Sequence, residues 1–165
     1  MLKASSPLDA RKRIISLLKS LIPESVRSAV RDVVQERKRW ICEKSSEWMS
    51  FNLLYWLVGP VERINVDVPV DNSSGLETWQ SGVKLKECRY LVEVGCKSAC
   101  LNLCKVPTQT LFNEEFNMPL YMKPNFEDCS CEFLFGISPP TEESDPAFSE
   151  ACYTTCYKFT KEAKR

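Results

Sequence analysis

The sequence is organised around residues 96–104, which read Cys96-Lys97-Ser98-Ala99-Cys100-Leu101-Asn102-Leu103-Cys104. Residues spaced by four lie along one face of an α-helix, so the three thiols are expected to project as a stripe toward one partner. The 165-residue chain contains nine cysteines and no histidine. A transition metal bound here would therefore depend on thiolates, with carboxylates as the other charged ligands. This pattern favours iron–sulfur or zinc chemistry over imidazole-ligated iron.

Other cysteines extend this pattern: the run Cys129-Ser130-Cys131, a second pair spaced by four at Cys152 and Cys156, and two that stand apart, Cys42 and Cys88. Two helices with thiol stripes and one cysteine on a strand are expected to face a shared centre. A 4Fe–4S cluster or a structural zinc ion needs four such thiolates. Disulfides and plain core packing remain alternatives, because free cysteines are among the most buried residue types.

The composition fits one domain with a core and a terminal extension, since 44% of the residues are apolar. The net charge is zero but uneven: residues 1–50 carry 11 Lys and Arg against 6 Asp and Glu. This basic head indicates either contact with an anionic lipid surface or a solvated helix with ordinary charge pairs. Neither a secretory signal nor a plastid transit peptide is evident at the start of the chain.

The first half of the sequence predicts helices. Asp9 is expected to cap a helix that runs to Ile22, and a second helix is expected to begin at Pro23. Residues 47–58 predict a third, aromatic-rich helix that ends at Gly59 and Pro60. Residues 48–61 carry no formal charge, but this run is too short to span a bilayer. The third helix is either buried in the core or lies in a membrane interface.

The second half predicts a small sheet and the cysteine-bearing helices. Alternation predicts strands over residues 61–70 and 83–86, with a polar loop over 71–82, and a further short strand is expected over 131–135, closed by Gly136. Helices are expected over residues 89–104, from Pro107 to Phe116, and over 152–161, whereas residues 117–126 and 138–147 are expected to be irregular. The predicted fold class is α+β: N-terminal helices, a small antiparallel sheet, and cysteine-bearing helices around a metal centre.

Several ordered runs between Cys88 and Cys156 resemble one known family: Cys88-Arg89-Tyr90-Leu91, residues 96–109, Met118-Pro119-Leu120, Pro124-Asn125-Phe126-Glu127-Asp128, Ser130-Cys131-Glu132, Phe135-Gly136, Pro139-Pro140, Asp145-Pro146 and Cys152 with Cys156. Upstream, residues 56–60 also match. The chain is similar to the plant β-carotene isomerase family of strigolactone biosynthesis, the Dwarf-twenty-seven type. The resemblance divides the chain into an N-terminal helical extension, 1–46, and a single isomerase-like domain, 47–165, with its cysteine-rich core at 88–156.

The resemblance implies an enzyme of the plastid, a cis–trans isomerase that uses iron to interconvert all-trans- and 9-cis-β-carotene or a related carotenoid. Six cysteines fall on the family's framework and are the implied metal and cofactor ligands: Cys96, Cys100, Cys104, Cys131, Cys152 and Cys156. The iron would be mononuclear or part of an iron–sulfur cluster such as 4Fe–4S. Cys129 departs from the framework and receives no role.

A polyene double bond rotates more easily when its bond order falls, which an iron centre achieves by electron exchange or Lewis-acid coordination. We hypothesise that an apolar slot holds the substrate, lined by Phe112, Phe116, Phe133 and Phe135. These rings are alternatively plain core. Glu127 and Asp128 are candidate acceptors near the metal or helix caps. No catalytic acid or base is assigned, because a hydrocarbon offers no readily exchanged proton.

The rival function is a non-catalytic iron–sulfur or zinc-stabilised module, either an electron carrier or an interaction domain. Expected partners are the carotenoid, an electron donor and a membrane surface. Nucleic-acid binding is not expected, because the basic residues lie on the N-terminal helices without an aromatic stacking platform. Cysteine–histidine catalysis is excluded by the absence of histidine.

Overall fold

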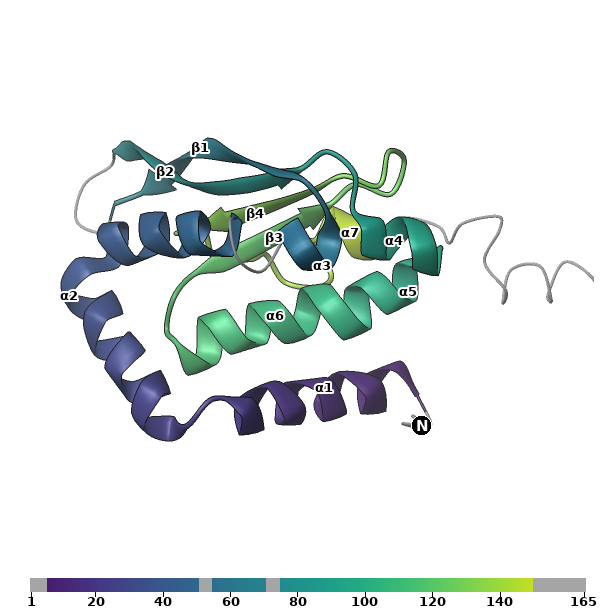
Figure 1. Cartoon of the computed structure of the whole chain (residues 1–165), viewed down its shortest axis with the longest axis horizontal. Helices are drawn as coiled ribbons and strands as arrows, with labels where there is room; N and C mark the ends of the chain where they lie inside the picture. The colour runs from purple at the N-terminus through teal and green to yellow at the C-terminus, as the bar shows by residue number, and fades with distance from the viewer. Residues whose placement is uncertain (1–5, 51–54, 71–74, 150–165) are drawn as a thin grey trace, which may run out of the picture.

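The structure is a computed structural model that describes residues 6–50, 55–70 and 75–149. Within these residues, four strands form an antiparallel sheet in the order β1-β2-β4-β3, with helices layered on one side of it (Figure 1). The strands are β1 (Val61–Pro69), β2 (Leu76–Leu85), β3 (Leu120–Pro124) and β4 (Cys131–Phe135). The predicted α+β architecture with a small antiparallel sheet is confirmed.

The helices are α1 (Pro7–Leu21), α2 (Glu24–Trp48), α3 (Tyr55–Val58), α4 (Arg89–Val94), α5 (Lys97–Ala99), α6 (Val106–Thr110) and α7 (Pro146–Ser149). Helix α1 runs alongside α6, on the side of α6 away from the sheet (Figure 1). Its N-cap is Ser6, whose Oγ accepts a hydrogen bond from the Asp9 amide at 3.1 Å. The prediction that Asp9 caps this helix is wrong, because Pro7 fits the first helical position and leaves Ser6 outside it.

Helix α2 has two arms that meet at Arg37, where φ is −139° and ψ is 47°. The first arm turns away from α1, and the second packs on β2 (Figure 1). The second arm continues through Trp48, so residues 47–48 belong to α2 and not to a separate helix. Residues 51–54 of the predicted third helix lie outside the described residues. Its last part is α3, which ends at Val58 just before Gly59, as predicted.

The described aromatic side chains of this predicted helix are not buried. Trp48, Tyr55, Trp56 and Leu57 are exposed, whereas Met49 and Val58 are buried. The interpretation of this segment as a core helix is therefore wrong for the described aromatic residues. No helix within the described ranges is long and apolar enough to cross a membrane.

Two strand predictions are correct and two need correction. Strands β1 and β4 lie where they were predicted, but β2 begins at Leu76, so residues 76–82 are not a loop. Strand β3 lies in the segment predicted to be irregular. The first part of β2 was not predicted because its solvent-facing side chains are polar and because Gly82 is a residue type typical of turns. Gly82 is instead required beside the bulge in β1, since a Cβ there would lie 2.5 Å from Ile64 Cγ1.

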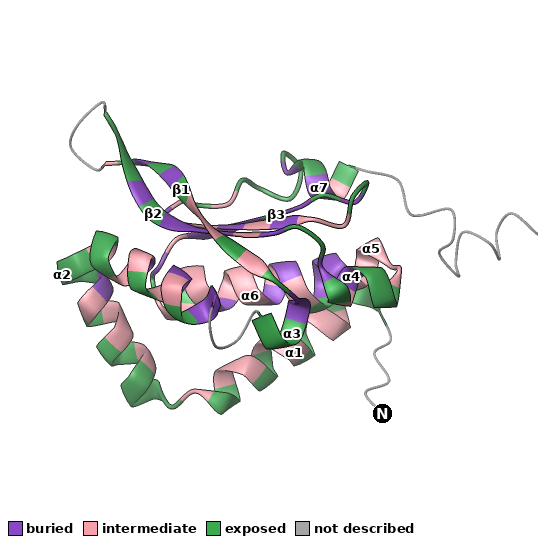
Figure 2. Ribbon diagram, turned by 45° about the horizontal axis from the view of Figure 1, so that its top comes forward, coloured by how far each residue is buried: buried purple, intermediate pink, exposed green. Residues whose placement is uncertain are grey.

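The core lies between the sheet and the helices, where buried residues line the facing surfaces of both layers (Figure 2). Many of the charged side chains of α1 and α2 form ion pairs, which favours the solvated-helix interpretation of the basic head. The pairs are Arg11–Glu142, Arg13–Asp9, Lys19–Glu115, Arg27–Glu24, Arg27–Glu115, Arg31–Glu24, Arg39–Glu43, Arg39–Glu77 and Lys44–Glu47. Three of these pairs tie the N-terminal helices to the rest of the chain through Glu115 and Glu142.

Candidate functional site: a cysteine-lined cavity and an apolar groove

The cysteine triplet does not lie on one uninterrupted helix. Helix α4 ends at Val94 because Gly95 takes a left-handed conformation with φ of +55°. The chain then restarts a helix at residue 97, with Cys96 as its extended N-cap residue at φ −139°. The predicted helix over 89–104 is therefore wrong. Cys100 and Cys104 share the new helix, whereas Cys96 stands at its entrance.

The restarted helix covers residues 97–115, and we call it the cysteine helix. It consists of α5, a π-helical turn at Cys100–Lys105, α6, and a second π-helical turn at Leu111–Glu115. Pro107 lies inside this helix and does not open a new one, because the residues on both sides keep helical angles. Proline has no amide to donate and its ring crowds the preceding turn. The wider π turn just before Pro107 relieves that crowding.

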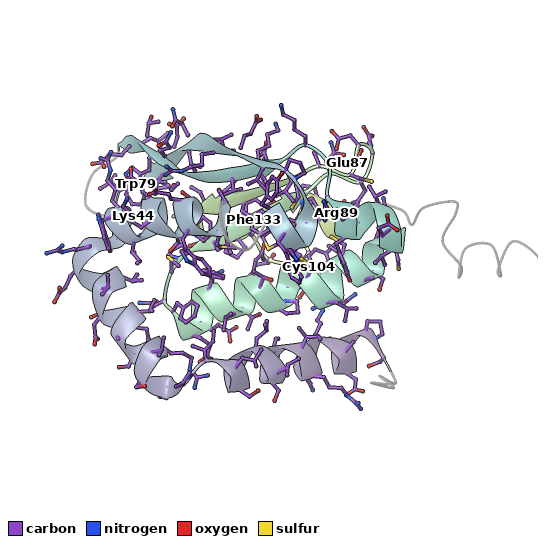
Figure 3. All side chains as sticks on the ribbon, in the orientation of Figure 1. Lys44, Trp79, Glu87, Arg89, Cys104 and Phe133 are labelled. Atoms are coloured by element: carbon purple, nitrogen blue, oxygen red, sulfur yellow. The ribbon has the colours of Figure 1, made fainter. Side chains whose placement is uncertain are left out.

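Four cysteines from three separate elements line one small cavity of about 20 Å³. They are Cys88 before α4, Cys100 and Cys104 on the cysteine helix, and Cys131 on β4. We call this space the cysteine cavity, and its remaining lining residues are Val58, Leu85, Tyr90, Leu91, Lys105, Met122, Pro124 and Phe133. Figure 3 shows Cys104 and Phe133 in the layer between the cysteine helix and the sheet.

Cys88 was not assigned to the site from its sequence position, because it stands eight residues before the triplet. The Cys88 amide donates to the Cys129 carbonyl at 2.7 Å, and this bond fixes Cys88 at the N-cap of α4. The family-like run that begins at Cys88 was the signal that could have identified it. Cys129 has a left-handed backbone conformation with φ of +58°. Its contact with Cys88 is made by its backbone carbonyl.

The loop that carries Cys129 is closed by its own side chains. Asp128 Oδ1 accepts a hydrogen bond from the Ser130 amide at 2.8 Å, and Asn125 Oδ1 accepts one from the Glu127 amide at 2.8 Å. These are side-chain turns that set the approach to β4. In the structure Asp128 therefore acts as a turn residue and caps no helix, and the Glu127 side chain is exposed.

The cavity environment keeps its thiols neutral when no metal is bound. Burial raises the pKa of Cys100 to about 12, helped by the neighbouring Cys104 and Cys88, and raises the pKa of Cys104 to about 12. Burial also raises the pKa of Cys131 well above its usual value, with further contributions from Cys104, Cys100 and Cys88. A bound cation would reverse this preference, because metal coordination deprotonates a thiol outright.

One buried cation borders the cysteine cavity. Lys105 is fully buried, and its Nζ lies 2.5 Å from Asp145 Oδ2 and donates to the Met122 carbonyl at 2.5 Å. The same Nζ lies 4.7 Å from the centre of the Tyr121 ring. Asp145 also caps α7, since its Oδ1 accepts from the Ala147 amide at 3.0 Å. The pair therefore links the cysteine helix to the segment that precedes residue 150.

The predicted metal centre is not confirmed. Across residues 6–50, 55–70 and 75–149, no three Cys, Asp or Glu side chains are arranged to hold one metal ion. The donor chemistry of the cysteine cavity nevertheless fits such a group, because four thiols are the number and type that zinc and iron–sulfur sites use. A volume of about 20 Å³ has room for about one water-sized sphere. This size fits a single ion better than a multi-iron cluster.

A second hollow is an apolar groove of about 400 Å³ enclosed by the bend of α2. It is lined by Val30, Ile41, Lys44, Ser45, Trp48, Met49, Phe112, Phe116 and Met118. Residues 41, 44, 45, 48 and 49 recur at helical spacing, so one face of the second arm of α2 forms a wall. We call this hollow the α2 groove. Its size and apolar lining are those of sites that hold an apolar ligand.

The four predicted phenylalanines do not line one slot. Phe112 and Phe116 line the α2 groove, Phe133 lines the cysteine cavity, and Phe135 packs behind Phe112 with ring centres 5.6 Å apart. Cys131, Phe133 and Phe135 alternate along the buried face of β4. The buried face of β4 therefore extends from the cysteine cavity to Phe135, which packs against Phe112 of the α2 groove. Whether these rings contact a substrate stays a prediction.

The structure brings Cys100, Cys104 and Cys131 together among the predicted ligands, and it adds Cys88. Cys96 does not line the cavity, although it lies close enough to Tyr90 to contribute to the raised pKa of that phenol. Cys152 and Cys156 lie outside the described residues, as does the predicted helix over 152–161. Their assignment as ligands therefore stays a prediction.

Fold and site together define a small α+β protein with a thiol-lined cavity beneath an antiparallel sheet and an apolar groove beside it. Residues 56–144 match the family model described as Beta-carotene isomerase D27-like, C-terminal. The chain belongs to this D27-like family, as its motifs predicted. The match begins in α3 and ends before α7, so it contains the four described cysteines of the cavity.

Two curated relatives carry the name Beta-carotene isomerase D27, chloroplastic. The protein from Medicago truncatula is 33% identical over 143 residues, which cover 87% of this chain and 54% of the relative. The protein from Arabidopsis thaliana is 38% identical over 101 residues, which cover 61% of this chain and 36% of the relative. The chain thus spans about half or less of these relatives. No solved structure matches the chain.

Proposed function

We propose that this chain is a carotenoid cis–trans isomerase that interconverts the all-trans and 9-cis forms of β-carotene or a closely related carotenoid. Membership of the D27-like family and the names of two relatives support this proposal. The structural observation that carries it is the buried face of β4, on which Cys131 borders the cysteine cavity and Phe135 packs against a ring of the α2 groove. The names of the two relatives also support a plastid location and a role in carotenoid metabolism. A place in strigolactone biosynthesis rests on the motif resemblance alone.

The α2 groove would hold one section of the polyene. Its walls are mostly apolar side chains, from both arms of α2, from the end of the cysteine helix and from Met118, with Lys44 and Ser45 as the polar members. Such walls bind a hydrocarbon by excluding water. Phe112 and Phe116 meet edge to face at 5.4 Å, which fixes both rings against lateral movement. The groove therefore supplies orientation for the substrate, and no proton donor or acceptor is required of it.

A single iron ion at the cysteine cavity is the cofactor that we infer. Cys88, Cys100, Cys104 and Cys131 would hold it, and the small volume of the cavity favours one ion over a 4Fe–4S cluster. Iron held there would supply electron exchange or Lewis acidity, either of which would lower the order of the double bond that rotates. Cys88, Cys100 and Cys131 are buried and Cys104 is partly buried, which limits the access of water to the site. The Lys105–Asp145 pair holds the neighbouring helix in position.

The experiment compares Cys100→Ser with Cys42→Ser after anaerobic purification. Cys42 is fully buried but does not line the cysteine cavity, so it controls for the loss of any buried thiol. Iron and sulfide per chain are measured first. Isomers of β-carotene are then separated by chromatography after incubation with the detergent-dispersed all-trans form. We expect iron without stoichiometric sulfide, and loss of both iron and isomerisation in Cys100→Ser alone.

The other outcomes identify the alternatives. Stoichiometric zinc without iron would contradict the redox mechanism and favour a zinc-stabilised interaction module. Iron with sulfide, but with no change in carotenoid geometry, would favour an electron carrier. Equal iron content and activity in Cys100→Ser and Cys42→Ser would remove Cys100 from the site.

A further inference from the structure

The surface formed by α3 and α4 carries exposed apolar side chains on two elements that pack side by side (Figure 1). Tyr55, Trp56 and Leu57 of α3 are exposed, and so are Val92 and Val94 of α4. We call these five residues the α3–α4 surface. Trp56 is 75% exposed, so it protrudes instead of filling a gap in the core. Exposed apolar patches on two adjacent elements are typical of interaction sites.

The chemistry of this surface fits a lipid interface. Tryptophan and tyrosine concentrate where hydrocarbon meets the polar headgroups, because each ring is apolar with one polar group. The sequence carries no formal charge from residue 48 to residue 61. The Arg89 side chain bonds the Trp56 carbonyl at 3.4 Å, which places a cation at the edge of the surface, near headgroup phosphates.

The charges around the surface identify the kind of lipid. The depression beside it is bordered by two cations, Lys86 and Arg89, and by two anions, Glu87 and Glu93. These charges cancel, so the rim has no net attraction for an anionic membrane. Binding would depend on the apolar side chains, and an uncharged or zwitterionic bilayer is the matching partner. We propose that the α3–α4 surface docks on such a bilayer.

This proposal rests on the proposed function, because that function gives the protein a reason to dock on a membrane. A carotenoid dissolves in the hydrocarbon of a membrane and not in water, so an isomerase must collect it from lipid. Trp48 lines the α2 groove and is also exposed, and Ser50 is separated from Tyr55 by five residue steps. An extended chain of that length spans at most about 18 Å. The groove wall and the proposed docking surface therefore lie on neighbouring parts of the molecule.

The test is flotation of the full chain with phosphatidylcholine vesicles that contain no carotenoid, at 50 mM and 500 mM NaCl. We expect the wild-type chain to float equally at both salt concentrations. Trp56→Ser and, independently, Val92→Ser should lower the bound fraction, the first by at least about fivefold. The matched control is Trp40→Ser, since Trp40 is also exposed but lies near the bend of α2. Circular dichroism confirms that each variant is folded.

Three results would overturn the proposal: no flotation of the wild-type chain, equal flotation of Trp56→Ser and Trp40→Ser, or release at 500 mM NaCl, which would indicate binding through basic residues. A concentration-dependent dimer that Trp56→Ser abolishes would assign the surface to a second copy of the chain. Flotation is measured without substrate, whereas isomerisation is measured in detergent. Failure of one proposal is therefore distinguishable from failure of the other.

Discussion

Replacing Asp145 by Asn should destabilise the protein more than any change of a surface charge. Asp145 is 3% exposed and Lys105 is fully buried, so the amino group of Lys105 would be left in the core without a counter-ion. Asparagine retains an oxygen that can accept from the Ala147 amide, so the cap of α7 is preserved. The variant therefore isolates the loss of the negative charge.

The expected loss lies at the lower end of the cost of breaking a buried ion pair, about 3 kcal/mol, because the Met122 carbonyl still accepts from Lys105 Nζ. For a chain of this size, such a loss lowers Tm by about 6–12 °C. Salt should not change the difference, since neither group is accessible to counter-ions. In Lys105→Met/Asp145→Asn, which leaves no buried charge, at least about half of the lost stability should return.

Urea unfolding followed by circular dichroism at 50 mM and 500 mM NaCl measures these differences. Glu142→Gln is the control, because it removes an ion pair with Arg11 in which Glu142 is half exposed. That change should cost below about 1 kcal/mol. A loss in Asp145→Asn no larger than in Glu142→Gln, or a double variant no more stable than Asp145→Asn, would refute this account of the pair.

Two further predictions concern the thiols and the sheet. In metal-free protein, stability should be full below pH 9 and should fall as the pH rises from 9 toward 12, because burial raises the pKa of Cys42 and Cys100 to about 12 while unfolded thiols ionise near 9. Urea midpoints measured from pH 8 to 10.5 check this prediction, and a constant midpoint would contradict it. In Cys42→Ser the midpoint should fall less steeply with pH. Gly82→Ala should cost about 1–3 kcal/mol in the same assay, since its Cβ would lie 2.5 Å from Ile64 Cγ1. Gly95→Ala, which meets no atom within 4 Å, should cost only about 1–2 kcal/mol for its left-handed backbone, so a smaller loss at Gly82 would count against the steric argument.

Local patterns predicted those elements whose side chains alternate or recur in a regular way. Strand β4 was predicted over its full length because its buried and partly buried residues alternate strictly. The end of strand β2 was predicted, but its first part, residues 76–82, was missed because most of that part faces solvent, so polar residues there carried no strand signal. Its position is set by pairing with β1 and β4, which local sequence does not encode.

The candidate site shows the same division between local and long-range information. The spacing of Cys100 and Cys104 correctly predicted that both lie on one helix, but it also placed Cys96 there. A left-handed Gly95 ended the preceding helix and removed Cys96 from the stripe. Cys88 joined the cavity through a backbone bond to Cys129, a contact across 41 positions of sequence that spacing does not reveal. The exposed position of Trp56 is likewise a result of packing, since its apolar neighbours left both burial in the core and a place in a membrane interface open.

Strand β4 gives the site its geometry, because one register controls both hollows. Cys131, Phe133 and Phe135 share its buried face, and residues two apart on a strand always do. From Cys131 to Phe135 the strand advances four residues, or about 13 Å, which sets the spacing along β4 between the cysteine cavity and the ring that packs against Phe112. A one-residue slip would turn all three side chains to the opposite face. The antiparallel pairs that β4 makes with β2 and β3 prevent that slip, and they therefore preserve the alignment of thiols and apolar groove on which the proposed reaction depends.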